Sequence, residues 1–198
     1  MIANVLTIAG SDPSGGAGIQ ADLKSFSALG CYGMAVITAL TAQNTRGVTG
    51  VHVLPATFLA AQIDTIFADI RVDAVKIGMI ATGELAATVA DRLKAHGARN
   101  IVLDPVLVAT SGDALGSPDV VEAMRAHLFP LADLVTPNVP EAERLSGIET
   151  GGVNAGLELA ARKLHDMGAR AVLVKGGHHA GDKAEDVLFS EGQVQVFS

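Results

Sequence analysis

The sequence predicts a single α/β domain over residues 1–198, with a mostly parallel central sheet and helices on both of its faces. Three observations lead to this prediction. Apolar runs of strand length alternate with amphipathic stretches at least five times, which is the pattern of repeated βα units. Hydrophobic residues make up 49% of the chain and charged residues only 18%, as expected for a sheet that is covered on both faces. The length of 198 residues suits one such domain.

The expected strands are short apolar runs that end in Gly, Pro, Asn, Asp or Gln. Gly33 to Thr41 is nearly all apolar, which is typical of a central parallel strand, and the turn residues 190–192 join the last two strands into a hairpin. In chain order the expected strands are 5–9, 33–41, 51–54, 74–77, 101–103, 134–135, 171–174, 186–189 and 193–197.

The expected helices have apolar residues at helical spacing and recognisable first residues. Pro55, Thr82, Ser117-Pro118 and Asn154 open four of them, while Gly97, Pro130 and Gly168 lie at or beyond helix ends. Their apolar stripes are Ile19, Leu23 and Phe26; Leu59, Ile63, Ile66 and Ile70; Leu85, Val89 and Leu93; Val121, Met124 and Leu128; and Leu157, Ala161 and Leu164.

A glycine-rich segment separates the first strand from the first helix, and its glycines allow the backbone to approach a ligand closely. It is not a P-loop, because Gly16 is followed by Ala17 where a P-loop has lysine, and no lysine occurs before Lys24. Residues 16–21 match a dinucleotide fingerprint, but they begin six residues after Gly10, and the second strand ends in an amide rather than an acid. We therefore disfavour dinucleotide binding.

Composition also narrows the class of partner. The net charge is −7 and the 14 basic residues are scattered, which argues against nucleic-acid binding. No apolar run approaches the roughly 20 residues that a membrane span needs. The single Cys31 cannot form an internal disulfide, and the first residues lack the charged start of a secretion signal. These features predict a cytoplasmic protein with a small-molecule partner.

Polar residues follow the predicted strands at their carboxyl ends, which lie at one edge of a parallel sheet and form its ligand-binding edge. Polar residues also occur at strand starts, so charge alone decides little. The carboxyl-terminal set is distinguished by its glycines, prolines and amides, which shape the backbone. The set comprises Gly10-Ser-Asp12, Gln43-Asn44, Gly78-Met79, Asp104, Asn138 with Glu141, and Lys175-Gly-Gly.

Six stretches that include these residues resemble, in register, the hydroxymethylpyrimidine/phosphomethylpyrimidine kinases of thiamine biosynthesis, a family of the ribokinase-like superfamily. The first stretch is the most specific, and together they extend from the first strand to near the end of the chain. They are Thr7-Ile-Ala-Gly-Ser-Asp-Pro-Ser-Gly-Gly-Ala-Gly-Ile-Gln-Ala-Asp22, Ala39-Leu-Thr-Ala-Gln-Asn-Thr45, Lys76-Ile-Gly-Met79, Leu103-Asp-Pro-Val106, Thr136-Pro-Asn-Val-Pro-Glu141 and Val174-Lys-Gly-Gly-His178.

The resemblance implies a three-layer αβα ribokinase-like fold and a kinase that uses ATP and Mg²⁺. It implies phosphorylation of the primary alcohol of 4-amino-5-hydroxymethyl-2-methylpyrimidine, and then of the monophosphate. It further implies a homodimer, to which the sequence itself adds only its high apolar fraction.

By the same resemblance, Gln43 contacts the pyrimidine ring while Gly10, Asp22, Met79 and Val106 line its pocket. The chemistry agrees, because an amide offers one acceptor and two donors to the amino group and ring nitrogen of an aminopyrimidine. A solvated loop amide is the alternative for Gln43, and ordinary core packing is the alternative for Met79 and Val106.

Phosphoryl transfer needs charge neutralisation, and the resemblance assigns this task to acids and a lysine. Asp104 and Glu141 are expected to hold Mg²⁺, and Asn138 and Lys175 to contact ATP. The alternatives are a favourable first-turn charge for Glu141 and a surface lysine for Lys175. His178-His179 has no further ligands at suitable spacing, so we interpret it as a pair of loop histidines.

One feature of the family is not found in these 198 residues. Ribokinase-like kinases carry, after the final hairpin, a Gly-Thr-Gly-Cys or Gly-Thr-Gly-Asp segment that forms the anion hole and supplies the catalytic residue. We therefore expect the C-terminal portion of the fold to be missing, with no catalytic residue in this chain and little activity on its own. Two alternatives remain: a pyridoxal/pyridoxine-type kinase of the same superfamily and a non-catalytic pyrimidine-binding protein.

Overall fold

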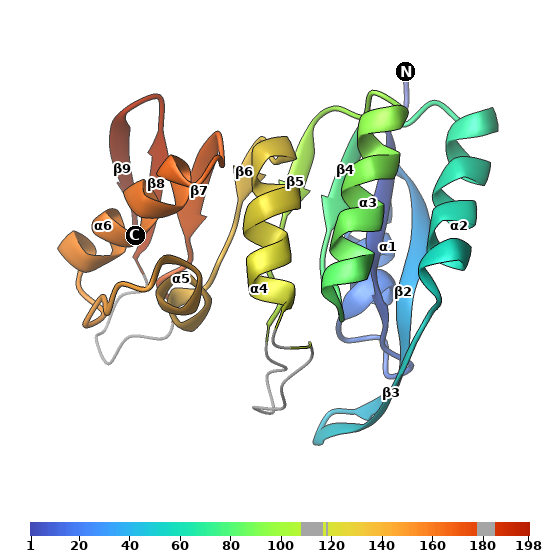
Figure 1. The fold of residues 1–198 in the computed structure, drawn as a ribbon, viewed down its shortest axis with the longest axis horizontal. Coiled ribbons are helices and arrows are strands. Elements are labelled where there is room, and N and C mark those ends of the chain that lie inside the picture. Colours follow the sequence, from blue (N-terminus) through green and yellow to red (C-terminus); the bar gives the residue numbers. More distant parts are fainter. Residues whose placement is uncertain (108–116, 118, 178–184) are drawn as a thin grey trace.

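The computed structural model describes residues 1–107, 117, 119–177 and 185–198, and it consists of one large sheet with helices packed against it (Figure 1). Within the described chain the sheet has the strand order β3-β2-β1-β4-β5-β6-β7-β8-β9. The strands from β2 to β7 in this order are parallel, and β3, β8 and β9 add antiparallel pairings at the two edges. The predicted, mostly parallel sheet is confirmed. Its strands are β1 (Asn4–Ser11), β2 (Tyr32–Asn44), β3 (Gly47–Val53), β4 (Ala74–Ile77), β5 (Ile101–Leu103), β6 (Leu134–Val135), β7 (Ala171–Val174), β8 (Asp186–Ser190) and β9 (Gln193–Phe197).

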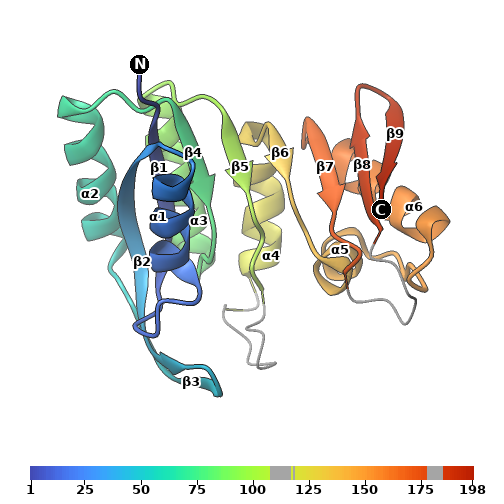
Figure 2. The same cartoon turned by 180° about the vertical axis from the view of Figure 1, so that it is seen from behind.

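Helices lie on both faces of this sheet, as the two views show (Figures 1 and 2). Helices α2, α3, α4 and α6 cover one face, and α1 covers β1 and β2 on the other. The predicted three-layer αβα arrangement is therefore present. The helices are α1 (Gly18–Ala28), α2 (Ala56–Asp69), α3 (Gly83–Ala95), α4 (Val120–Ala123), α5 (Val139–Ser146) and α6 (Asn154–Asp166).

Local signals set many of these boundaries where the sequence places them. The predicted bounds of β4, β5, β6, β7 and β9 are the observed ones. Thr82 caps α3 by accepting a hydrogen bond from the Leu85 N–H, as an N-cap threonine should. Glu191 and Gly192 both have positive φ (52° and 77°), the conformation of a two-residue hairpin turn that joins β8 to β9.

The helix before β6 differs from the prediction in its buried face. Val120, Met124 and Leu128 are buried, whereas the predicted Val121 is only partly buried. After the single turn of α4 the chain continues as a π-type turn over Met124–Leu128 and a short 3₁₀ turn over Phe129–Leu131. The predicted first-turn Pro118 lies outside the described residues.

Helix α1 lies close to β2 because a glycine faces it. Ile19 is buried, whereas Leu23 and Phe26 are only half-buried. A Cβ added at Gly33 of β2 would lie 2.9 Å from Leu23 Cδ2 and 3.3 Å from a ring carbon of Phe26. The apolar stripe of α1 therefore rests on the bare backbone of Gly33, and this contact places the N-terminus of α1 beside the end of β1.

The parallel strands all point their carboxyl ends to the edge of the sheet where the β2–β3 hairpin projects, at the bottom of Figure 1. The core between the sheet and its helices is apolar, and Leu6, Ile8 and Ile77 of the central strands are completely buried. No helix in the described ranges is long and apolar enough to cross a bilayer. The glycine, amide and charged residues that follow the predicted strands lie at this carboxyl-terminal edge.

Candidate active site

The loop between β1 and α1 is organised by one carboxylate, that of Asp12. This side chain is only 3% exposed and accepts hydrogen bonds from the hydroxyl and N–H of Ser14 and from the N–H groups of Gly16 and Ala17. Burial raises the pKa of Asp12, but these hydrogen bonds outweigh it and hold the pKa below the ordinary value of an aspartate. Asp12 therefore fixes the loop as an anion.

Gly18, the first residue of α1, can only be a glycine. Its φ is +57°, and a Cβ there would lie 2.2 Å from the carbonyl oxygen of Gly10. The close approach brings the start of α1 against the end of β1, where Ser11 and Gly18 form an isolated bridge. The N-terminus of α1 thus faces the same space as the carboxyl end of the strand.

That space is a cavity of about 670 Å³ between the glycine-rich loop, the β2–β3 hairpin and the ends of β4 and β5. All five residues predicted to contact the pyrimidine line it, and so does Asp104. Asn138, Glu141 and Lys175 do not. The residues that line it include Gly10, Asp22, Gln43, Met79, Val106, Asp104, Thr41, Arg46 and Lys76.

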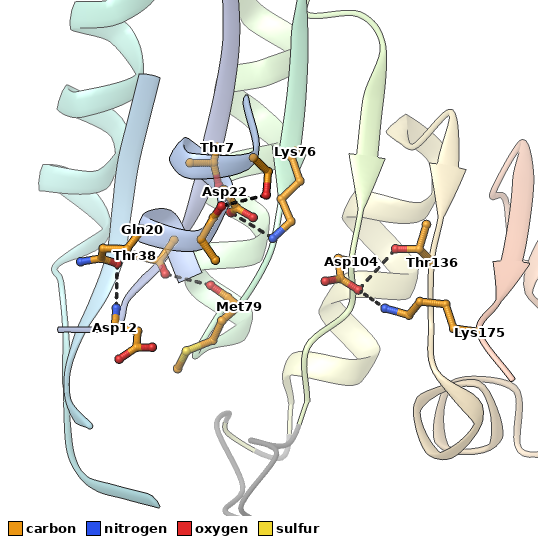
Figure 3. A network of polar contacts seen from close by, with 12 residues as sticks. Thr7, Asp12, Gln20, Asp22, Thr38, Lys76, Met79, Asp104, Thr136 and Lys175 are labelled. Atoms are coloured by element: carbon orange, nitrogen blue, oxygen red, sulfur yellow. Dashed lines mark hydrogen bonds and ion pairs between the residues drawn. The ribbon is translucent and has the colours of Figure 1, made fainter. Parts of the chain in front are cut away.

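Asp22 is held at the wall of the cavity by two donors (Figure 3). The Thr7 hydroxyl donates to its Oδ2 at 2.6 Å, and the Lys76 ammonium donates to the same oxygen at 3.0 Å. Thr7 and Lys76 are register partners in the neighbouring strands β1 and β4. Asp22 therefore belongs to a partly buried polar network and not to a fully solvated helix surface.

Gln43 lies inside a strand, which corrects the prediction that it follows one. Strand β2 continues to Asn44 because its last residues pair with β3, and the register shifts between Ala42 and Gln43. The hydroxyl of Thr41 lies 3.1 Å from Gln43 Oε1 and anchors the amide beside the cavity. The same hydroxyl lies 2.9 Å from the carbonyl oxygen of Ser11, so it links the hairpin to the end of β1.

The apolar wall of the cavity is also a small core. Met79 packs with Ala39 and Ala81, and Val106 is packed against them. The thioether of Met79 would lie 3.0 Å from a Cβ added at Gly10, so the absence of a side chain at Gly10 leaves room for it. Met79 and Val106 therefore do both of the things considered for them: they pack in a small core and they line the cavity.

The other predicted residues lie at the ends of β5, β6 and β7. Lys175 Nζ lies 2.8 Å from Oδ1 of Asp104, and the Thr136 hydroxyl lies 3.3 Å from the same oxygen (Figure 3). Residues Asn138 and Lys175 form an isolated parallel bridge. Asp104 thus belongs both to the cavity and to this second group, here called the phosphate end (Asp104, Asn138, Glu141 and Lys175).

Asn138 and Glu141 form a capping box at the start of α5. The Asn138 side chain accepts from the Glu141 N–H at 2.9 Å, and Glu141 Oε2 accepts from the Asn138 N–H at 2.9 Å. Glu141 is nevertheless 6% exposed, and burial raises the pKa of its carboxyl. The nearby Asp104 raises this pKa further, while the Asn138 N–H and the Lys175 charge oppose the rise. Glu141 therefore does cap the first turn of α5, and its carboxylate also interacts electrostatically with Asp104 and Lys175.

These residues fit a magnesium ion that is bound mainly by phosphates. Mg²⁺ typically keeps several waters and takes one or two carboxylates plus phosphate oxygens. Lys175 and Thr136 both contact Oδ1 of Asp104, so Asp104 retains its second oxygen for the ion. Glu141 accepts from the N–H groups of both Asn138 and Leu107, so it would hold the ion through a water molecule. Across the described ranges no group of three or more His, Cys, Asp or Glu side chains could hold a metal ion by itself. His178-His179 lies outside the described residues.

Residues 12–198 match the sequence profile of the family described as phosphomethylpyrimidine kinase. The chain belongs to this family. A relative from Salmonella typhimurium, named hydroxymethylpyrimidine/phosphomethylpyrimidine kinase, is 51% identical over 195 residues, which are 98% of this chain and 73% of the relative.

Solved structures agree with the phosphomethylpyrimidine kinase family and with the ribokinase-like fold. The phosphomethylpyrimidine kinase of Clostridium difficile superposes with a TM-score of 0.90 at 44% identity, covering 98% of this chain and 84% of that one. A pyridoxal kinase from Staphylococcus aureus, solved with AMP-PCP and pyridoxal, has a TM-score of 0.87 at 38% identity and covers 98% and 69%. The predicted family and fold are thus confirmed, and the chain belongs to a family of kinases.

Two residues of this phosphomethylpyrimidine kinase site receive no role from the sequence. Asp12 is expected at a strand end, and an Asp at the start of a turn segment such as Asp-Pro-Ser-Gly-Gly is a known signal for side-chain to backbone hydrogen bonds. Lys76 lies inside a predicted strand. Its signal is a charge in an otherwise apolar run, Ala-Val-Lys-Ile, because such a charge requires a partner when the strand is central.

Proposed function

We propose that this chain carries out two ATP-dependent phosphorylations. The first is on the hydroxymethyl group of 4-amino-5-hydroxymethyl-2-methylpyrimidine, and the second is on the resulting monophosphate. The observation that carries the proposal is the position of Asp104, which lines the 670 Å³ cavity and is ion-paired to Lys175 at the phosphate end. An alcohol held in the cavity would thus be adjacent to groups that can hold phosphates. Kinase catalysis depends chiefly on such positioning and on charge neutralisation.

On the cavity side, we assign ring recognition to Gln43 and Asp22. The Gln43 amide can accept from the exocyclic amine and donate to a ring nitrogen, while Asp22 has an oxygen left to accept a further N–H. Gly10, Met79 and Val106 provide the apolar and backbone surface on which a flat ring can lie.

At the phosphate end, we assign ATP to Lys175 and Asn138 and Mg²⁺ to Asp104 and Glu141. The ion would neutralise phosphate charge. Asp104 would hold it through the oxygen that Lys175 leaves free, and Glu141, which accepts from the Asn138 and Leu107 N–H groups, would hold it through a water molecule. Lys175 is 41% exposed at its side chain and can therefore reach a phosphate as a point charge.

A pyridoxal-type kinase is the second candidate, favoured by the structural likeness to the Staphylococcus aureus enzyme solved with AMP-PCP and pyridoxal. Both substrates carry a hydroxymethyl group on a nitrogen heterocycle. The paired hydrogen bonds available at Gln43 favour the aminopyrimidine, whose amine stands beside a ring nitrogen.

A coupled assay of ADP release with each alcohol tests the proposal. Because the matched region is 73% of the Salmonella relative, the assay uses the 198-residue chain and a fusion of this chain to the remaining C-terminal part of that relative. We expect the fusion to phosphorylate the aminopyrimidine alcohol faster than pyridoxine. Faster turnover of pyridoxine would favour the second candidate. A fusion that binds the pyrimidine without turnover, beside an active relative, would contradict the kinase proposal and indicate a binding protein.

A cytoplasmic location and a homodimer also remain proposals that rest on the family. Leu40, Val51 and Val53 at the β2–β3 edge are exposed apolar side chains of the kind that subunit contacts cover. Light scattering of the purified chain would give its mass in solution. A monomer at micromolar concentration would contradict the homodimer.

A further inference from the structure

We infer that Lys76 is a positioning residue of the pyrimidine site, which fixes the Asp22 carboxylate with one oxygen turned to the ligand. The inference rests on the proposed function. Its basis is the convergence of two protein donors, Thr7 Oγ1 and Lys76 Nζ, on the single oxygen Oδ2 of Asp22. Within the described chain Oδ1 of Asp22 has no hydrogen-bond partner, and Asp22 lines the cavity.

The position of Lys76 in the sheet is unusual for a cation. It stands in β4, a central strand, between Val75 and Ile77, which are buried in the core on the opposite face. Its own side chain is 22% exposed and that of Asp22 is 17% exposed. An ammonium placed there loses hydration, and the Asp22 carboxylate compensates for it in a partly dehydrated site. The cation and the carboxylate therefore belong together, because replacing Lys76 alone would leave the partly buried Asp22 without its charged partner.

The Lys76 side chain passes over Gly78, where the backbone carries no side chain. A Cβ added at Gly78 would lie 2.9 Å from Lys76 Nζ and 3.0 Å from the Cβ of Ala9. Any side chain at Gly78 would therefore displace the ammonium from Asp22. The absence of a side chain at Gly78 and the register pairing of Thr7 with Lys76 together fix where the two donors meet the carboxylate.

This arrangement gives Asp22 a defined chemical role. If the two donors were shared between both oxygens, each oxygen would keep only part of its acceptor capacity and neither would be left wholly to a ligand. With both donors on Oδ2, the carboxylate is held in one orientation while Oδ1 can accept a charge-assisted hydrogen bond. The fitting ligand group is an N–H donor such as the exocyclic amine of the aminopyrimidine. Lys76 would then set the preference for an amino-substituted ring through its hold on Asp22.

Calorimetric binding of two ligands tests this role: the aminopyrimidine alcohol and its analogue with hydrogen in place of the amine. The variants are Lys76→Met, Lys76→Arg, Asp22→Asn and the double variant that combines Lys76→Met with Asp22→Asn. We expect Lys76→Met to weaken the amino alcohol roughly 10-fold and to change the analogue less than about twofold, which is the effect of one charge-assisted hydrogen bond. Lys76→Arg should restore most of the preference. In the Asp22→Asn background, Lys76→Met should add little.

A Lys76→Met variant that keeps the wild-type preference for the amino ligand would overturn the inference, as would independent, additive losses for Lys76→Met and Asp22→Asn. If Lys76→Met does not fold, Thr7→Val removes the other donor to Oδ2, and an unchanged preference there would overturn the inference as well. A wild-type chain that binds neither ligand would contradict the proposed function itself, and the role of Lys76 would fall with it. A preference lost only in the variants supports the inference.

Discussion

The ammonium of Lys175 lies 2.8 Å from Oδ1 of Asp104, although 71 positions separate the two residues in the chain. The contact joins the ends of β5 and β7 across β6, and it connects the ligand cavity to the phosphate end. A partly exposed pair of this kind contributes little to stability, so its value should lie in function.

The first prediction concerns this lysine. Lys175→Met should weaken ATP binding by roughly 10-fold or more, because a charge-assisted contact to phosphate is lost, and should weaken the aminopyrimidine alcohol much less. Calorimetry with each ligand measures the difference, and Lys94→Met on the exposed last turn of α3 is a matched control. Equal losses for both ligands would indicate a general structural defect instead.

The second prediction separates the two roles of Glu141. Glu141→Gln keeps an oxygen that can accept from the Asn138 N–H, so the cap and the melting temperature should be retained, while the Mg²⁺ dependence of ATP binding should weaken. Glu141→Ala also removes the hydrogen bond from the Asn138 N–H, while the Asn138 side chain still caps the N–H of residue 141, and the loss of this one bond should cost about 1 kcal/mol of stability. Titrating ATP binding with Mg²⁺ and measuring thermal unfolding separate these effects. Unaltered Mg²⁺ dependence in Glu141→Gln would leave Glu141 with the helix cap alone.

The third prediction concerns ring recognition. Gln43→Leu should weaken the aminopyrimidine alcohol by roughly 1 to 3 kcal/mol, because ring polar groups lose their partners, with little change in melting temperature. Gln193→Leu, on the exposed edge strand β9, is the control. Binding that is as tight as in the wild type would remove Gln43 from the site.

The fourth prediction follows from the lowered pKa of Asp12. Since its folded-state pKa lies below the unfolded value of about 3.9, the ionised carboxylate stabilises the native loop above that value, and this stability is lost as the pH falls through the folded pKa. Asp12→Asn should therefore be less stable than the wild type at pH 7, and the difference should shrink below about pH 4. Thermal unfolding of both proteins between about pH 3 and pH 7 checks this. A constant difference over that range would contradict the role of the carboxylate charge.

Local chemistry explains which parts of the fold the sequence could predict. Strand β4 and the start of α3 agree with prediction because a short apolar run and an N-cap threonine act over a few residues. The end of β2 differs from the prediction, because the pairing of Gln43 with Val48 depends on a hairpin register that no single residue specifies. The π turn over Met124–Leu128 was not predicted either, since the apolar spacing of this segment is equally that of an α-helix.

The candidate site divides in the same way. Residues such as Gly10, Gln43 and Asp104 could be placed at one edge from strand order alone, since the carboxyl ends of parallel strands meet there. The partner of Asp22 could not, because Lys76 is 54 positions away and the choice of a single carboxylate oxygen depends on side-chain geometry. The double role of Glu141, as cap and as a buried acid, also needs the fold.

The most direct test of this account is a crystal structure of the chain with the aminopyrimidine alcohol. We predict that the ring lies in the cavity, with its amine within hydrogen-bond distance of Gln43 or Asp22 and its hydroxymethyl group directed toward Asp104. A ring bound outside this cavity, or one whose hydroxymethyl group points away from Asp104, would contradict the account.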